Sequence, residues 1–128
     1  MFTREQRSTF PYWFAHWCAF NMTALNCGAW KFKYLFHDFE KPWMKLFMSY
    51  PTVQHWHRTH NRHHLEYPGV IDIEAMLIDW ECSRFTKTTS PRTAREEWEV
   101  EKKDINTDFF NLHPELYAVE SILDKLGL

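Results

Sequence analysis

Residues 9–27, which read TFPYWFAHWCAFNMTALNC, decide the fold class of this protein. Their apolar side chains recur at steps of three and four residues, which is the spacing of one face of an α-helix. Ser8 or Thr9 can cap the start of this helix, and Gly28 can end it. His16 and three further polar residues interrupt the run, so we do not expect it to span a membrane.

The same spacing continues along the chain, and no stretch alternates between apolar and polar residues as a half-buried strand would. We predict further helices over residues 29–38, 42–48, 52–64, 72–85 and 113–126, with a polar loop over 86–91 and a segment over 93–103 that is charged on most faces and lies on the surface. The last helix has an apolar face made by Leu116, Val119, Ile122, Leu123 and Leu126. Residues 1–128 are therefore predicted to form a single domain, a compact all-α helical bundle.

The composition excludes several classes of protein. Apolar residues make up 45% of the chain, which is too many for a disordered segment. The 15 Lys and Arg against 17 Asp and Glu give no net positive charge, and we expect neither nucleic acid nor a membrane as a partner. Three cysteines without a CxxC pair suit reduced thiols in the cytoplasm. Aromatic residues reach 18%, and we predict that most form the core, the alternative being a stacking wall for a nucleobase.

Five of the eight histidines lie between residues 55 and 64. If residues 52–64 are one helix, then His57, His60 and His64 lie on one face and His63 lies about one step around it. Neutral imidazole is the commonest metal-binding side chain, so this cluster predicts a metal site. The alternative is a solvated polar face of the helix.

Partners for such a metal lie elsewhere in the chain. His16 lies on the first predicted helix, and His37 and Asp38 lie at the end of the second. Asp79 stands between two apolar residues on a later helix, and a buried carboxylate is costly unless it meets a cation or hydrogen-bond donors. The order of these residues along the chain (His, then His-Asp, then several His, then Asp) resembles that of the HD superfamily of metal-dependent phosphohydrolases, which has an all-α fold. The resemblance implies that a first His, the His-Asp pair and a later Asp hold one metal, and that additional histidines hold a second.

A closer resemblance covers nearly the whole chain. Four ordered motifs are similar to those of a family of small phage and bacterial proteins of unknown function. The runs H-D-L/F-x-K-F/P, H-x-x-x-N-x-H-H-x-E-Y, M-L-x-D-aromatic and L-M-H-P-E are matched by residues 37–42, 57–67, 76–80 and 111–115. This resemblance favours His57 over His60 as a ligand, because the family commonly has Arg at the position of His60. The chain departs from the family at Glu40, where Ser is frequent, and at Leu65 and Ala75, so the departures concern the surroundings of the ligands.

We therefore expect one or two divalent ions, which could be Mn, Fe, Zn, Mg or Co. The predicted ligands of one ion are His16, His37, Asp38 and Asp79. A second ion would be held by His57 with His63 or His64, and Asp38 would bridge the two.

The predicted activity is hydrolysis of a nucleotide or a related small phosphate ester, with Asp38 holding the ions that activate water. Lys41 or Arg62 would neutralise the phosphate, and Arg58 could also meet it, although Lys41 could instead pair with Glu66. His113 is interpreted as structural. Two other functions fit the same residues, namely an HD-like di-iron oxygenase and a non-catalytic binding or inhibitory protein with a structural metal site. The sequence is also compatible with a homodimer.

Overall fold

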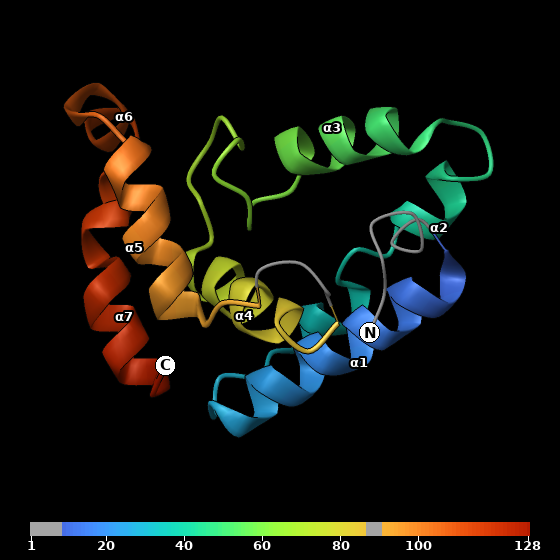
Figure 1. Cartoon of the computed structure of the whole chain (residues 1–128), viewed down its shortest axis with the longest axis horizontal. Helices are drawn as coiled ribbons and strands as arrows, with labels where there is room; N and C mark the ends of the chain where they lie inside the picture. Colours follow the sequence, from blue (N-terminus) through green and yellow to red (C-terminus); the bar gives the residue numbers. More distant parts are fainter. Residues whose placement is uncertain (1–8, 87–90) are drawn as a thin grey trace.

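The computed structural model describes residues 9–86 and 91–128, and all regular structure in these residues is helical. The predicted all-α fold is thereby confirmed, and Figure 1 shows α5, α6 and α7 gathered at one end of the molecule. The predicted loop over 86–91 lies mostly outside the described residues. With η denoting a 3-10 helix, the elements are α1 (Phe10–Asn26), η2 (Phe32–Phe36), α2 (Lys41–Met44), α3 (Tyr50–His60), α4 (Ile73–Ser83), α5 (Ala94–Asp104), α6 (Thr107–Leu112), η3 (Pro114–Ala118) and α7 (Val119–Leu126).

Helix α1 begins and ends where the sequence predicts. Thr9 caps it, since Thr9 Oγ1 accepts a hydrogen bond from the Tyr12 backbone N–H at 3.4 Å. Gly28 follows the helix with φ +66°, a left-handed conformation that suits a residue without Cβ. Helix α1 packs along α4, and this contact forms the centre of the core. Its fully buried side chains include Phe20, Met76, Leu77 and Ile78.

The segment between α1 and α3 differs from the prediction. Residues 29–38 contain only the short η2, and α2 is a single turn. The predicted helix over 29–38 is wrong because Lys31 has an extended backbone with φ −132° and ψ 148° and Asp38 has a left-handed one with φ +54°, and a right-handed helix can contain neither. The Trp13 indole Nε1 donates a hydrogen bond to the Asp38 carbonyl at 2.9 Å and ties this turn to α1. A contact between distant residues thus overrides the local helical spacing.

Helix α3 is shorter than predicted, because it ends at His60. Asn61 leaves the helix with an extended backbone of φ −110° and ψ 131°, and its side-chain amide donates to the His57 carbonyl at 2.9 Å. His63 and His64 therefore lie in the turn that follows. The prediction that His57, His60 and His64 share one helix face is wrong.

The C-terminal third is helical. Helix α5 begins with a capping box in which Thr93 and Glu96 exchange hydrogen bonds. The side of this helix that carries Trp98 is buried. The predicted helix over 113–126 begins as η3 and continues as α7. The buried residues of its apolar face are Leu116, Val119, Leu123 and Leu126. No helix in the described part of the chain is long and apolar enough to cross a bilayer.

Most aromatic side chains lie outside the core, so that expectation is wrong. Among the described residues, only Tyr12, Phe20, Tyr34 and Trp98 are buried aromatics. Elements η2 and α2 are single turns laid against α1, so much of their aromatic surface stays in contact with solvent. The exposed rings of this region include Phe10, Phe14, Phe32, Phe36, Phe39 and Trp43.

Candidate metal centre

The predicted ligands come from three helices and two turns, and the fold brings them together. Helices α1, α3 and α4 carry His16, His57 and Asp79 respectively. The turn between η2 and α2 carries His37 and Asp38, and the turn after α3 carries the remaining two, His63 and His64. They form two adjacent groups of possible metal ligands.

The first group consists of His16, His37, Asp38 and Asp79, all of which are buried. Asp79 Oδ1 lies 2.9 Å from His16 Nε2 and 3.1 Å from His37 Nε2. Asp38 Oδ2 lies 3.4 Å from the same His16 nitrogen. One ligand atom of each residue lies within 4.8 Å of all the others, a spacing that a single cation can span.

The second group consists of His57, His63 and His64, whose ligand nitrogens also lie within 4.8 Å of one another. Asp38 Oδ1 faces this group, at 3.1 Å from His57 Nε2 and 3.3 Å from His63 Nε2. Asp38 Oδ1 also lies 3.5 Å from His37 Nε2 of the first group, so this oxygen lies between the two groups, while Oδ2 faces His16. This carboxylate is placed to bridge two cations.

Four buried atoms of the centre have no hydrogen-bond partner. They are Asp38 Oδ1 and the Nε2 atoms of His57, His63 and His64. Buried polar groups are almost always satisfied, so an unpaired group of converging acceptors needs a specific explanation. A cation provides it, because Asp38 Oδ1 lies within 3.3 Å of two of these nitrogens and the ligand atoms of the three rings lie within 4.8 Å of one another. The residues present therefore fit a metal ion.

Glu40 orients a ligand of the second group. Its Oε1 accepts a short hydrogen bond from His57 Nδ1 and a second from Asn61 Nδ2 at 3.0 Å. A carboxylate that holds the proton on Nδ1 leaves Nε2 as the metal-binding atom and makes it more basic. Sequence reasoning missed this role and noted Glu40 only as a departure from a family motif. The available signal was a second acidic residue, two positions after Asp38.

The ligands of the first group are also held in place. The Phe20 ring stacks on the His37 ring with centroids 3.6 Å apart. Cys82 Sγ lies 3.9 Å from His16 Nδ1, on the side of the ring away from the carboxylates. Asp38 keeps its left-handed backbone through the Trp13 hydrogen bond, a conformation that costs about 1–3 kcal/mol for a residue with a side chain.

The two carboxylates remain charged in this buried setting. Burial alone would raise the pKa of Asp38, but His37, His57 and Lys41 outweigh it and lower that pKa well below its usual value. The pKa of Asp79 is also lowered against the effect of burial, by its hydrogen bonds with His16 and His37. Both groups are therefore anionic ligands at neutral pH.

The histidines divide into two kinds. Burial lowers the pKa of His37 to about 4, and burial together with His63 lowers that of His64 to about 2. These two rings are neutral and ready to bind a metal. Burial also disfavours a charge on His16 and His57, but their neighbours outweigh it and raise both pKa values, with Asp38 acting on each ring. In the metal-free protein these two rings hold protons that a cation must displace.

Cationic side chains stand at the edge of the centre. Lys41 Nζ lies 3.2 Å from Asp38 Oδ2, and it does not pair with Glu66. Glu66 instead pairs with Arg58 at 3.2 Å. Lys41 and Arg58 line one polar hollow above the ligands, whereas Arg62 lines another on the side of His37 and His63.

The remaining histidines lie outside both groups. His60 is exposed and stacks on the Trp56 ring with centroids 4.3 Å apart. His55 is exposed on α3. His113 is buried 3.2 Å from Glu115 Oε1, away from the ligands, in agreement with a structural role.

Comparison with protein-family models, curated proteins and solved structures gave no match for this chain. The similarity to HD proteins and to the small phage and bacterial family therefore rests on the sequence motifs alone. What the structure adds is a small all-helical domain with two buried groups of His and Asp that could bind metal ions. Its function is inferred from that geometry.

Proposed function

We propose that the protein is a metal-dependent hydrolase of phosphate esters. The observation that carries this proposal is the position of Asp38 between the two groups of candidate ligands: Oδ2 faces His16, and Oδ1 lies near His37 of the first group and near His57 and His63 of the second. A carboxylate in this position can hold two cations close enough to act on one phosphoryl group. The unpaired ligand atoms around Asp38 support a second ion in addition to the first.

The charges of the residues suit a phosphate ligand. Asp38 and Asp79 contribute two negative charges, whereas His37 and His64 contribute none. Two divalent cations held by this set keep a net positive charge. When bound, such cations lower the pKa of water toward neutrality and neutralise phosphoryl oxygens.

Lys41 and Arg58 are the groups of the chain best placed to orient the phosphate. The side chain of Lys41 is mostly buried, and its pKa is raised because Asp38 and other neighbours outweigh burial. It therefore keeps its charge next to the ligands. Arg58 lines the same hollow and offers a fork of N–H donors that fits phosphate oxygens. We propose that Lys41 neutralises the negative charge that develops on the phosphoryl group, and that Arg58 binds the outer phosphate oxygens.

The substrate class is a small phosphorylated molecule, with nucleotides included. The hollow that holds Lys41 is lined largely by polar and charged groups, as a phosphate requires. It is formed by Tyr12, His16, Asp38, Lys41, Tyr50, Gln54, Arg58, His64, Asp79 and Ser83.

Metal analysis followed by an activity screen tests this proposal. Protein purified without a His tag is analysed for its elements, reloaded with Mn, Fe, Zn, Mg or Co, and assayed on a panel of phosphate esters. We expect up to two ions per chain and release of inorganic phosphate. Asp38→Asn should abolish release, whereas the matched variant Asp104→Asn, at an exposed position of α5, should keep it.

Other outcomes would overturn the proposal. Bound iron with an oxygen-dependent reaction and no phosphate release would identify an oxygenase. Tight metal binding with no activity on any phosphate ester or oxidisable substrate would identify a structural site in a binding protein.

A further inference from the structure

The aromatic side chains that lie outside the core, between α1 and α2, form one connected surface, which we call the aromatic face. Each ring has at least one other ring of the face at a centroid distance of 5.4–6.5 Å, and these contacts link all of them into a single network. The members of the aromatic face are Phe10, Trp13, Phe14, Trp17, Phe32, Phe36, Phe39 and Trp43.

The exposed area of the aromatic face is close to what one partner of a stable dimer buries. All members except Trp13 and Trp17 are exposed, at 48–68% of their surface. Because an aromatic side chain has about 150–250 Å² to bury, these exposed rings leave on the order of 700 Å² in contact with solvent. The largest apolar patch of a typical monomer is about 300–600 Å², whereas each partner in a standard protein interface buries about 800 Å². The face is therefore larger than a monomer usually exposes.

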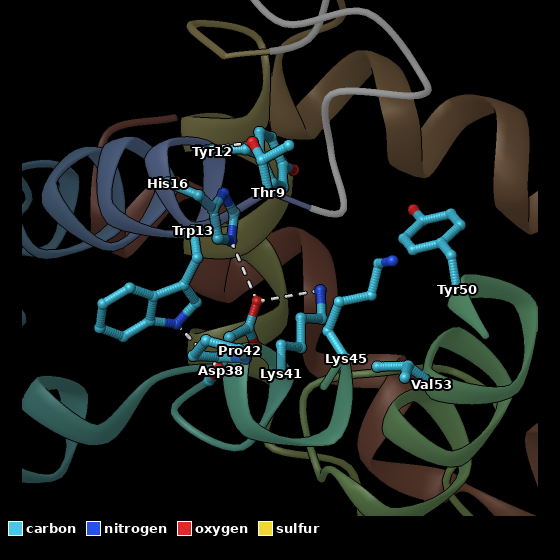
Figure 2. Close-up of a pocket in the computed structure, with 10 residues that line it drawn as sticks. All are labelled: Thr9, Tyr12, Trp13, His16, Asp38, Lys41, Pro42, Lys45, Tyr50 and Val53. Atoms are coloured by element: carbon cyan, nitrogen blue, oxygen red, sulfur yellow. Dashed lines mark hydrogen bonds and ion pairs between the residues drawn. The ribbon is translucent and has the colours of Figure 1, made fainter. Parts of the chain in front are cut away.

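The indole N–H groups at the centre of the face are already satisfied within the chain. Trp13 Nε1 donates to the Asp38 carbonyl at 2.9 Å, and Trp17 Nε1 donates to the Leu35 carbonyl at 2.9 Å. In Figure 2 the Trp13 ring extends away from Lys41, with its N–H toward the Asp38 turn. A buried polar group is costly only when it lacks a partner. A second surface can therefore cover both indoles without leaving either donor unpaired.

The lysines that neighbour the aromatic face are also paired within the chain. Lys31, Lys33 and Lys41 each form an ion pair with a carboxylate. Lys45 lies on another side of α2 and reaches toward Tyr50 (Figure 2). Anionic lipids and charged proteins are bound through free charges, of which paired lysines offer few. A neutral aromatic surface instead fits a copy of itself, since homodimer interfaces are more apolar than others and can be self-complementary.

We propose that the aromatic face joins two copies of this chain in a symmetric dimer. The same face of each copy packs against that of the other, so α1 and the segment from η2 to α2 form both sides of the interface. The turn that carries Asp38 lies against this face, because Trp13 is bonded to the Asp38 carbonyl and Phe39 is the next residue. The proposal is independent of the proposed function, since it needs neither metal nor substrate.

Sedimentation equilibrium over a series of protein concentrations tests the proposal on the unmodified chain. We expect a species of twice the 15.7 kDa mass of one chain. Interfaces of this size have affinities from micromolar to picomolar, so the Kd should be about 1 μM or tighter. Dilution below the Kd should also shift the tryptophan emission to longer wavelength, because Trp13, Trp17 and Trp43 then come into contact with water.

Two variants on different elements place a charge on the aromatic face. Phe14→Glu on α1 and Phe36→Glu on η2 change exposed side chains, so circular dichroism should stay as in the unmodified protein. Each variant should weaken the dimer about 100-fold or more, because the carboxylate would be buried without a partner. Leu112→Glu is the matched control, since Leu112 is 77% exposed on α6, at the end of the molecule away from α2 (Figure 1). It should leave the Kd unchanged.

Three results would overturn the proposal. The first is a monomer over the whole concentration range with no binding to lipid vesicles. The second is a monomer that sediments with vesicles of phosphatidylcholine and phosphatidylglycerol and loses this binding in Phe36→Glu, which would identify the face as a membrane surface. The third is a dimer that persists in both glutamate variants, because its interface would then lie elsewhere.

Discussion

Glu40→Gln is the most specific test of the second group of ligands. The substitution keeps the shape of the side chain but removes the negative charge that holds the proton on His57 Nδ1. The hydrogen bond from Asn61 to the side-chain oxygen can persist. His57 Nε2 is then less basic and less firmly oriented toward the cation.

The expected magnitude follows from this outer partner of the ligand. Loss of a carboxylate behind a metal-binding histidine weakens metal binding about 10- to 100-fold, or roughly 1.4–2.7 kcal/mol. Glu40 contacts His57 and Asn61 but none of the residues around Asp79. The weakening should therefore affect one of two ions, and the affinity of the first group should change much less.

Competition with a chromophoric chelator measures both affinities on one sample, and circular dichroism checks the fold. Glu120→Gln is the matched control, since Glu120 is an exposed partner of Lys102 on α7 and should leave both ions unaffected. A change below about threefold in both affinities for Glu40→Gln would refute the role of Glu40. Equal weakening of both ions would show that the two groups do not bind separately.

Four further experiments address the centre as a whole. Asp38→Asn should lose both ions because the oxygens of Asp38 face both groups, whereas Asp79→Asn should lose only one ion. The number of metal ions per chain is measured for each variant, and equal losses would contradict a bridging role of Asp38. Because the pKa values of His16 and His57 are raised, protons compete with the metal, and the affinity for metal should fall as the pH decreases from 8 to 6. Calorimetry in two buffers should show that protons are released when the metal binds, and a constant affinity over this pH range would exclude these two ligands. Chelation should lower the melting temperature by roughly 10 °C, since metal at a hundred times its Kd stabilises by about 2.7 kcal/mol, and an unchanged melting curve after confirmed metal loss would indicate a site that does not link the helices. Trp13→Phe should cost about 1 kcal/mol of unfolding free energy in urea by removing the bond to the Asp38 carbonyl, and an unchanged midpoint would show that this bond does not hold the turn.

Helical periodicity could be predicted from the sequence because it depends on short-range information, and the candidate ligands could be named from their residue types and their order along the chain. The start of α1 at Thr9, its end before Gly28 and the buried face of α7 follow from spacing and capping. The density of histidines over residues 55–64 and the apolar neighbours of Asp79 pointed to a site, and the resemblance to HD proteins added His16, His37 and Asp38. The need of Asp79 for a partner was visible in its apolar neighbours, and the resemblance to HD proteins grouped it with His16 and His37, whereas the contacts of 2.9 and 3.1 Å that join them come from the structure.

By itself, the sequence determined that this is a helical chain carrying metal-binding residue types in a specific order. Only the tertiary structure decided which atoms meet. Asp38 adopts a left-handed backbone, and α3 ends before His63, so that two turns, rather than one helix face, bring the ligands to a common point. Two contacts accompany this arrangement: Trp13 to Asp38 joins residues 25 positions apart, and Glu40 to His57 joins residues 17 positions apart. Local periodicity does not encode such pairs, because their energy exists only once α1 and α3 are packed around the same turn.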